Sequence, residues 1–239
     1  MKGKLFIVAT PIGNLSDITF RAIQCLKTSD LILCENSRNS QKLLSYYEIQ
    51  TPSQDLHKVK NFLHYNWIIN ILESGKNISY ISDAGTPGIS DPGSALVRHV
   101  RQKGIIVVPI PGASALSSIL SVSGAKTNPT HFLGFLSEKA HKKELELQQY
   151  VTQECLVVFY ESVHKIEKTL LLVRKLFPEA EILIGRELTK LHEEIIVWYP
   201  NQEFPNFEKR GEFVVLINNY FKKIAKEEKF TTDIKDEER

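Results

Sequence analysis

The chain has 239 residues, 42% of them apolar, and a formal net charge of +2. This length allows one large domain or two smaller ones, and the near-neutral charge argues against a polybasic nucleic-acid-binding protein. No stretch reaches the roughly 18 apolar residues of a membrane-spanning helix, and three widely spaced cysteines argue against a disulfide framework or structural zinc site and favour a reducing cytoplasm.

In the first half of the chain, apolar runs that predict strands alternate with segments of helical periodicity. Strands are expected at 5–10, 31–35, 78–82 and 105–110, and helices at 18–26, 42–47, 62–74 and 95–102. The strand runs are continuously apolar, as in a parallel sheet covered on both faces. The alternation predicts an α/β fold with a mostly parallel sheet, whose first helix is capped by Ser16 or Asp17.

The second half predicts a different sheet. Strands are expected at 155–160, 181–188, 193–199 and 211–218, with a helix at 163–176. The last strands follow one another through short links, which favours an antiparallel or mixed sheet. We therefore expect an N-terminal α/β domain at 1–112, a C-terminal α/β domain at 113–220 and a charged, frayed tail at 221–239.

The stretch SDAGTPGISDPG at 82–93 combines three glycines, two prolines and two aspartates. Glycine allows backbone angles that side chains forbid and proline fixes φ, so the loop is expected to be rigid and to let a ligand approach its backbone. Its glycine spacing does not match a dinucleotide fingerprint, and Ser94 stands where a P-loop needs lysine. Asp83 and Asp91 favour a ligand with an amine or a positive centre. The alternative is an elaborate strand-to-helix turn.

Two further loops follow predicted strands, ATPIGN at 9–14 and PGASA at 111–115. Loops at the carboxyl ends of parallel strands meet at one edge, so the three loops predict a cleft. The segment RELTKLHEE at 186–194 gathers charged side chains, with a solvated turn as the alternative. No histidine stands at a metal-ligand spacing, so no metal site is expected, and the segment 141–143 is expected at the surface.

These segments, together with FYES at 159–162 and GEFVVLI at 211–217, occur in a familiar order and spacing. They resemble the S-adenosylmethionine-dependent methyltransferases of the tetrapyrrole-methylase fold, from about Leu5 to Asn218. More narrowly, they are similar to the bacterial branch that 2′-O-methylates a cytidine ribose of 16S ribosomal RNA. The resemblance implies two α/β domains with the cofactor in a cleft between them.

Matched positions imply which residues serve S-adenosylmethionine. The implied contacts are Pro11, Asp83, Ala84, Gly85, Thr86, Ile89, Ser90, Gly112, Ser114, Phe159, Tyr160, Glu187, Leu188, Glu212 and Phe213. The sequence does not identify the base that removes the ribose proton, and Glu35, Lys190, His192 and Glu193 are the candidates. Phosphates of the RNA are expected at Arg38, Lys42, Lys58 and Lys60, with a solvated basic face as the alternative.

Two segments depart from the family pattern. ENSR at 35–38 replaces the usual EDTR, and DLHKVKN at 55–61 places lysines where acidic or neutral residues are usual. Two other functions stay open, a methylase of uroporphyrinogen or precorrin type and a non-catalytic RNA-binding module. The first would need several arginines in the cleft, and the matched loops supply only Arg38 and Arg186. The resemblance also implies small-subunit RNA as partner, no membrane, a homodimer and a cytoplasmic location.

Overall fold

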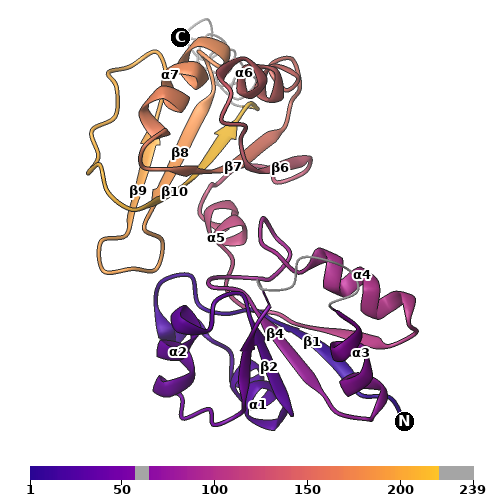
Figure 1. Cartoon of the computed structure of the whole chain (residues 1–239). Coiled ribbons are helices and arrows are strands. Elements are labelled where there is room, and N and C mark those ends of the chain that lie inside the picture. Colours follow the sequence, from indigo (N-terminus) through magenta and orange to yellow (C-terminus); the bar gives the residue numbers. More distant parts are fainter. Residues whose placement is uncertain (57–64, 221–239) are drawn as a thin grey trace, which may run out of the picture. The chain divides into compact units, whose positions relative to one another are not determined.

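The computed structural model describes residues 1–56 and 65–220. The chain divides into two compact units, Met1–Ser114 and a second unit that begins at Ala115 (Figure 1). The expected phosphate contacts Lys58 and Lys60 and the charged tail lie outside the described residues. No helix of the described part is long and apolar enough to cross a membrane.

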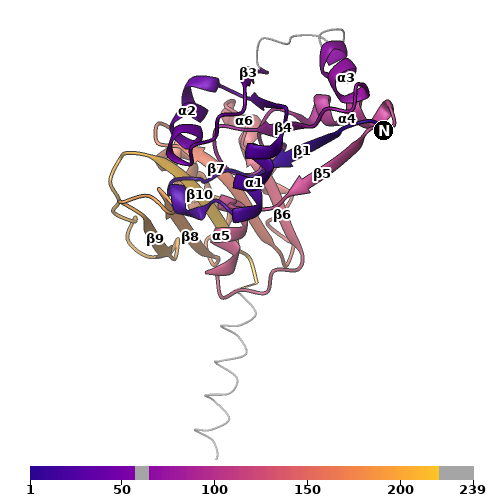
Figure 2. The same cartoon turned by 90° about the horizontal axis from the view of Figure 1, so that it is seen from below.

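The first unit is built on a five-stranded sheet in the order β3-β2-β4-β1-β5, in which every pairing is parallel. Its elements are β1 (Lys4–Val8), η1 (Leu15–Asp17), α1 (Phe20–Thr28), β2 (Leu31–Cys34), α2 (Ser37–Tyr46), β3 (Ser53–Asp55), α3 (Asn66–Glu73), β4 (Ile78–Ile81), α4 (Ser94–Gln102) and β5 (Ile106–Ile110). In Figure 2, β1 and β5 lie side by side, as their register requires. The predicted parallel sheet is confirmed.

Helices cover both faces of this sheet (Figure 1). Alternate strand residues point to opposite faces. Accordingly, Val8 and Ile81 pack with α1 and α2, whereas Leu5 and Ile78 pack with α3 and α4. The continuous apolar strands β2 and β4 are thus buried on both sides, whereas the edge strand β5 keeps Ile106 and Pro109 exposed. The carboxyl edge of the sheet is left for polar loops.

The second unit holds a mixed sheet in the order β6-β7-β10-β8-β9. Its elements are α5 (Ala115–Ser121), β6 (Thr130–Phe135), α6 (Ala140–Gln148), β7 (Leu156–Ser162), α7 (Ile166–Leu176), β8 (Glu181–Arg186), β9 (Glu194–Trp198) and β10 (Glu212–Asn218). Among the described strands of this unit, only β6 and β7 pair in parallel, so the predicted mixed sheet is confirmed. The main core lies between the sheet and the helices α6 and α7 (Figure 1).

Some expected boundaries are wrong for local reasons. Thr19, and not Ser16 or Asp17, caps α1, because its hydroxyl accepts a hydrogen bond from the Ala22 N–H at 3.1 Å. Helix α2 begins five residues before the expected 42–47, because the Asn36 side chain caps it. The strand expected at 181–188 ends two residues early, where the backbone turns left-handed.

The expectation that 141–143 lies at the surface is wrong for its last residue. Lys143 on α6 is only 7% exposed. Its ammonium group lies 2.7 Å from a Glu161 carboxylate oxygen on β7 and donates a second hydrogen bond, of 2.8 Å, to the Thr169 hydroxyl on α7. The Thr169 hydroxyl in turn donates to the same carboxylate. These buried partners explain why a lysine can occupy the interior.

Candidate functional site

The three loops at the carboxyl edge of the first sheet contact one another, as the sequence predicts. Thr10 and Gly85 exchange two backbone hydrogen bonds of 2.8 and 3.1 Å, which join the loop after β1 to the loop after β4. The Thr86 hydroxyl donates to the Ala113 carbonyl at 3.2 Å, which adds the loop after β5. A Cβ on Gly112 would lie 3.0 Å from the Ala9 Cβ, so this approach leaves little room for a side chain.

The glycine loop, residues 82–93, ends on a conformation that only glycine adopts easily. Gly93 has φ +118°, and a Cβ there would lie 2.4 Å from the Tyr80 ring. The Tyr80 hydroxyl donates to the Pro92 carbonyl at 3.0 Å. Ser90 also takes a left-handed φ, of +61°. Strained backbone of this kind persists where the surroundings fix it, which supports a rigid, shaped loop.

Acidic side chains gather where β2 and β4 end. The Glu35 carboxylate accepts a hydrogen bond from the Asp83 N–H at 3.2 Å, and the Asn39 amide donates to the Asp83 carboxylate at 2.7 Å. Burial raises the pKa of Asp91 to about 6, with smaller contributions from the charges of Glu35 and Asp83, against a hydrogen bond from Ser82 that lowers it. This edge therefore favours an amine or a cationic centre over a phosphate.

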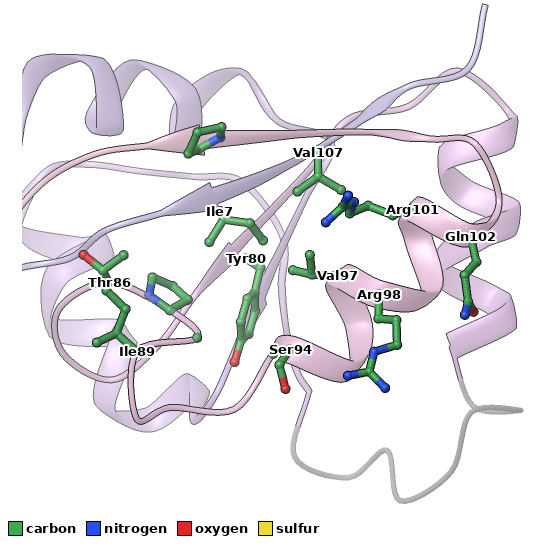
Figure 3. Close-up of a pocket in the computed structure, with 14 residues that line it drawn as sticks. Ile7, Tyr80, Thr86, Ile89, Ser94, Val97, Arg98, Arg101, Gln102 and Val107 are labelled. Atoms are coloured by element: carbon green, nitrogen blue, oxygen red, sulfur yellow. The ribbon is translucent and has the colours of Figure 1, made fainter. Parts of the chain in front are cut away.

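A cavity of about 760 Å³ lies between this loop, the sheet and α4 (Figure 3). It is lined by Ile7, Tyr80, Thr86, Pro87, Gly88, Ile89, Gly93, Ser94, Val97, Arg98, Arg101, Gln102, Val107 and Pro109. Thr86 and Ile89 belong to the implied cofactor contacts. Sequence reasoning missed Arg98 and Arg101, and the signal available was their spacing of three on one predicted helix directly after the glycine loop.

In the second unit, the implied contacts from β8 and β10 come together. Glu187 and Glu212 are joined by two hydrogen bonds of 3.0 and 2.9 Å, from the Glu187 N–H to the Glu212 carbonyl and from the Glu212 N–H to the Glu187 carboxylate. The backbone is left-handed at Glu187 and Thr189, with φ of +51° and +66°. A Cβ on Gly211 would lie 2.4 Å from the Glu187 Cγ, so the neighbouring strand must present glycine there.

The candidate bases have structural partners. The Lys190 ammonium donates to Glu187 at 2.8 Å and to Glu212 at 3.0 Å. Burial alone would lower the pKa of Lys190, but these two carboxylates raise it above its ordinary value, so the side chain stays charged at neutral pH and is a poor base. Glu193 accepts a hydrogen bond from the Thr189 N–H and thereby closes the turn. Glu35, as described, holds the glycine loop.

His192, the remaining candidate base, is exposed and lines a second cavity of about 690 Å³. The guanidinium of Arg186 forms part of the same lining. It is 6% exposed and pairs with Glu194 at 2.9 Å and Glu208 at 3.6 Å. This arginine is therefore neutralised inside its own unit.

Several implied contacts of the second unit lie in the core. Phe159 is fully buried and Phe213 is 3% exposed, so neither side chain is open to a ligand. Tyr160 is partly exposed and packs edge-on against Phe132 and Phe135 of β6. Its ring is the accessible one among the FYES aromatics.

The described phosphate candidates, Arg38 and Lys42, are exposed on α2. Their position at the surface agrees with either a phosphate contact or a solvated face. Within the two described ranges, no three His, Cys, Asp or Glu side chains are placed to hold a metal ion.

A family model for the tetrapyrrole (corrin/porphyrin) methylases matches residues 4–199. The chain belongs to this family. The tetrapyrrole methylase fold is seen again in the solved methyltransferase CobJ, with a TM-score of 0.66, 17% identity, and coverage of 91% of this chain and 94% of that one. Cobalt precorrin-4 methyltransferase CbiF gives a TM-score of 0.62 at 13% identity over 91% of this chain and 95% of its own.

Within the tetrapyrrole methylases, the chain is similar to curated proteins named ribosomal RNA small subunit methyltransferase I. It is 48% identical to the Leptospira biflexa protein over 98% of both chains. It is 40% identical to the Bacillus subtilis protein over 90% of this chain and 75% of that one. The expected resemblance is confirmed, and with it the expected enzyme class, an S-adenosylmethionine-dependent methyltransferase.

Proposed function

We propose that this tetrapyrrole methylase transfers a methyl group to the 2′-hydroxyl of a cytidine in small-subunit ribosomal RNA. The observation that carries the proposal is the 48% identity over 98% of both chains to a protein named ribosomal RNA small subunit methyltransferase I. We also propose the cytoplasm as the location and a homodimer as the assembly, in line with the resemblance.

The residues of the first unit fit the donor. When bound, S-adenosylmethionine would supply a methyl group activated by its sulfonium, with S-adenosylhomocysteine as the leaving group and water as the acceptor of the hydroxyl proton. The Glu35 and Asp83 carboxylates complement an amine or a positive sulfur. The close approach at Gly112 keeps the loop after β5 against β1, so backbone groups of Gly85 and Gly112 stay in fixed positions for binding. The chain's main contribution is alignment.

In the second unit, the Glu187–Lys190–Glu212 cluster would fix the backbone of the implied contacts. Both carboxylates of this cluster accept a hydrogen bond from Lys190, and that of Glu187 also accepts one from the Glu212 N–H, so they are engaged in structural contacts. The cleft expected between the two domains stays a prediction. A tetrapyrrole substrate remains the second candidate, and the neutralised Arg186 counts against it because such a substrate carries many carboxylates.

The test uses purified protein, radiolabelled S-adenosylmethionine and small ribosomal subunits that lack the endogenous modification. Label on one cytidine ribose, mapped by nuclease digestion and mass spectrometry, is the expected result. If an active control enzyme labels the same subunits and this protein does not, the RNA substrate is wrong. Label on uroporphyrinogen or a precorrin under the same conditions would then favour the second candidate.

A further inference from the structure

The cavity beside the glycine loop has an apolar floor. Ile7, Val97, Val107 and Pro109 line it from β1, α4 and β5 and are at least partly exposed (Figure 3). Its volume of about 760 Å³ falls within the range of small-ligand sites. A flat, weakly polar group such as a nucleobase can cover side chains of this kind.

Two cationic side chains of α4 line the same cavity, and Figure 3 shows Arg101 reaching toward Val107 while Arg98 points away from it. Arg98 and Arg101 are exposed on α4 and both line the cavity (Figure 3). Within the described residues, neither side chain makes an ion pair or a hydrogen bond, and none of the described lining residues is acidic. Because they are three residues apart on a helix, they lie on one side of it, where they can reach neighbouring phosphates.

The start of α4 adds to this charge. Ser94 lines the cavity, and the N-cap Gly93 offers no side chain to satisfy the first N–H groups of the helix. These groups carry partial positive charge. The cavity thus combines an apolar floor with unpaired positive charge, which is the chemistry of a single-stranded nucleic acid site.

The cavity also adjoins the loop implied in donor binding, with which it shares Thr86 and Ile89. A ribose that accepts a methyl group has to lie next to the donor, so the nucleotides beside it have to lie near this loop. A second copy of the chain fits less well as the occupant. It would have to place an acidic side chain against each arginine, because buried unpaired charge is costly, whereas RNA carries a phosphate at every nucleotide.

We propose that this cavity binds a single-stranded nucleotide segment of the RNA substrate, with Arg98 and Arg101 on its phosphates and a base on the apolar floor. The inference rests on the proposed function and names a substrate contact for it.

The test compares R98A, R101A and the double variant R98A/R101A with wild type. The matched control is K103A, which removes one positive charge at the end of the same helix from a residue that does not line the cavity. Michaelis constants are measured separately for unmethylated small subunits and for S-adenosylmethionine, and binding to the subunits is measured against salt.

The double variant is expected to raise the Michaelis constant for the subunits roughly tenfold or more, with little change for the donor. The slope of log affinity against log salt should fall by about 1 for each arginine removed. K103A should behave as wild type, and R98K/R101K should recover part of the affinity because it keeps the charge.

Three results would overturn the inference. If R98A/R101A and K103A have equal Michaelis constants for the subunits, the two arginines do not contact the RNA. A parallel rise for the donor would assign the cavity to the donor itself. A change of oligomeric state in sedimentation with unchanged RNA kinetics would mean that a second copy covers the cavity. A wild type that methylates no RNA rejects the proposed function, and this inference with it.

Discussion

At the scale of single residues, the least expected feature is the buried charge on α6. Lys143, Glu161 and Thr169 are 7%, 5% and 0% exposed and form a closed triangle of hydrogen bonds. The second Glu161 oxygen accepts from the Ser162 N–H at 2.9 Å, so the triangle fixes the end of the FYES strand. Breaking a pair of this kind leaves one charge buried without a partner.

We predict that Lys143→Met lowers the free energy of unfolding by about 3–5 kcal/mol, because Glu161 then stays buried without its cation. Urea unfolding followed by circular dichroism measures this change. Lys175→Met is the matched control, since Lys175 on α7 pairs with Glu144 on α6 at the exposed surface. A Lys143 variant no less stable than the Lys175 variant would contradict the prediction.

A second residue-scale prediction concerns two glycines of the glycine loop. Gly88 and Gly93 both have positive φ, of +86° and +118°, but only at Gly93 would a Cβ meet another atom, the Tyr80 ring. Alanine at Gly88 should cost roughly 1–2 kcal/mol from backbone strain alone. Alanine at Gly93 should cost about 1–3 kcal/mol more from overpacking. Equal losses in urea unfolding would show that Tyr80 moves aside freely.

Sequence reasoning located these glycines but not the Lys143 triangle. Glycines that stand close to two prolines and two aspartates are typical of a loop with a fixed backbone shape, so the local sequence alone indicates such a loop. The segment AHKKELELQ does not show that Lys143 is buried, because its burial depends on Glu161 and Thr169, which are distant in sequence. A contact of that kind becomes visible only once the helices α6 and α7 are packed against β7.

At the scale of elements, the glycine loop should respond to pH through Asp91. Its pKa in the folded protein is about 6, above the ordinary value of 3.8. Between about pH 4 and about pH 6 the folded state therefore binds more protons than the unfolded state, and this group's contribution to stability falls as pH rises. Asp91→Asn should gain stability over wild type across that window and show no difference at still lower pH.

Urea unfolding of wild type and D91N at a series of pH values measures this difference. Asp17→Asn, on the exposed turn η1, corrects for the general effect of losing a carboxylate. A constant difference between D91N and wild type from acid to neutral pH would show that Asp91 does not titrate in the predicted window.

Among the helices and strands, the extent of burial determined which ones the sequence predicts. The inner strands β1, β2 and β4 lie between helices on both faces, and their apolar runs were sufficient to predict them. The apolar run of β5 was also sufficient, although this edge strand is partly exposed. The edge strand β3 reads SQD and buries little, so nothing in its sequence distinguishes it from a loop. Helix α6 has weak apolar periodicity because a lysine occupies one of its two buried positions.

At the scale of the whole molecule, the chain offers one tryptophan in each unit, Trp67 on α3 and Trp198 on β9. The W198F variant therefore keeps Trp67 as a fluorescence reporter of the first unit, and the W67F variant keeps Trp198 as a reporter of the second. Since the resemblance implies donor contacts in both, S-adenosylmethionine at about 100 times its Kd should stabilise by about 2.7 kcal/mol and shift both fluorescence transitions in urea. A shift of only one reporter would restrict the donor to one unit.

The position of β1 has a consequence for how the chain folds as it is made. This first strand lies in the sheet between the last two, with Leu5 opposite both Ile78 and Val107. During synthesis, the apolar strand β1 therefore has no partner until β4 emerges, and the sheet is complete only after β5. Pairing between strands so distant in sequence slows folding. The loops around Gly112 form at that same step. A nascent chain thus acquires its first complete sheet and the edge that we propose for donor binding together.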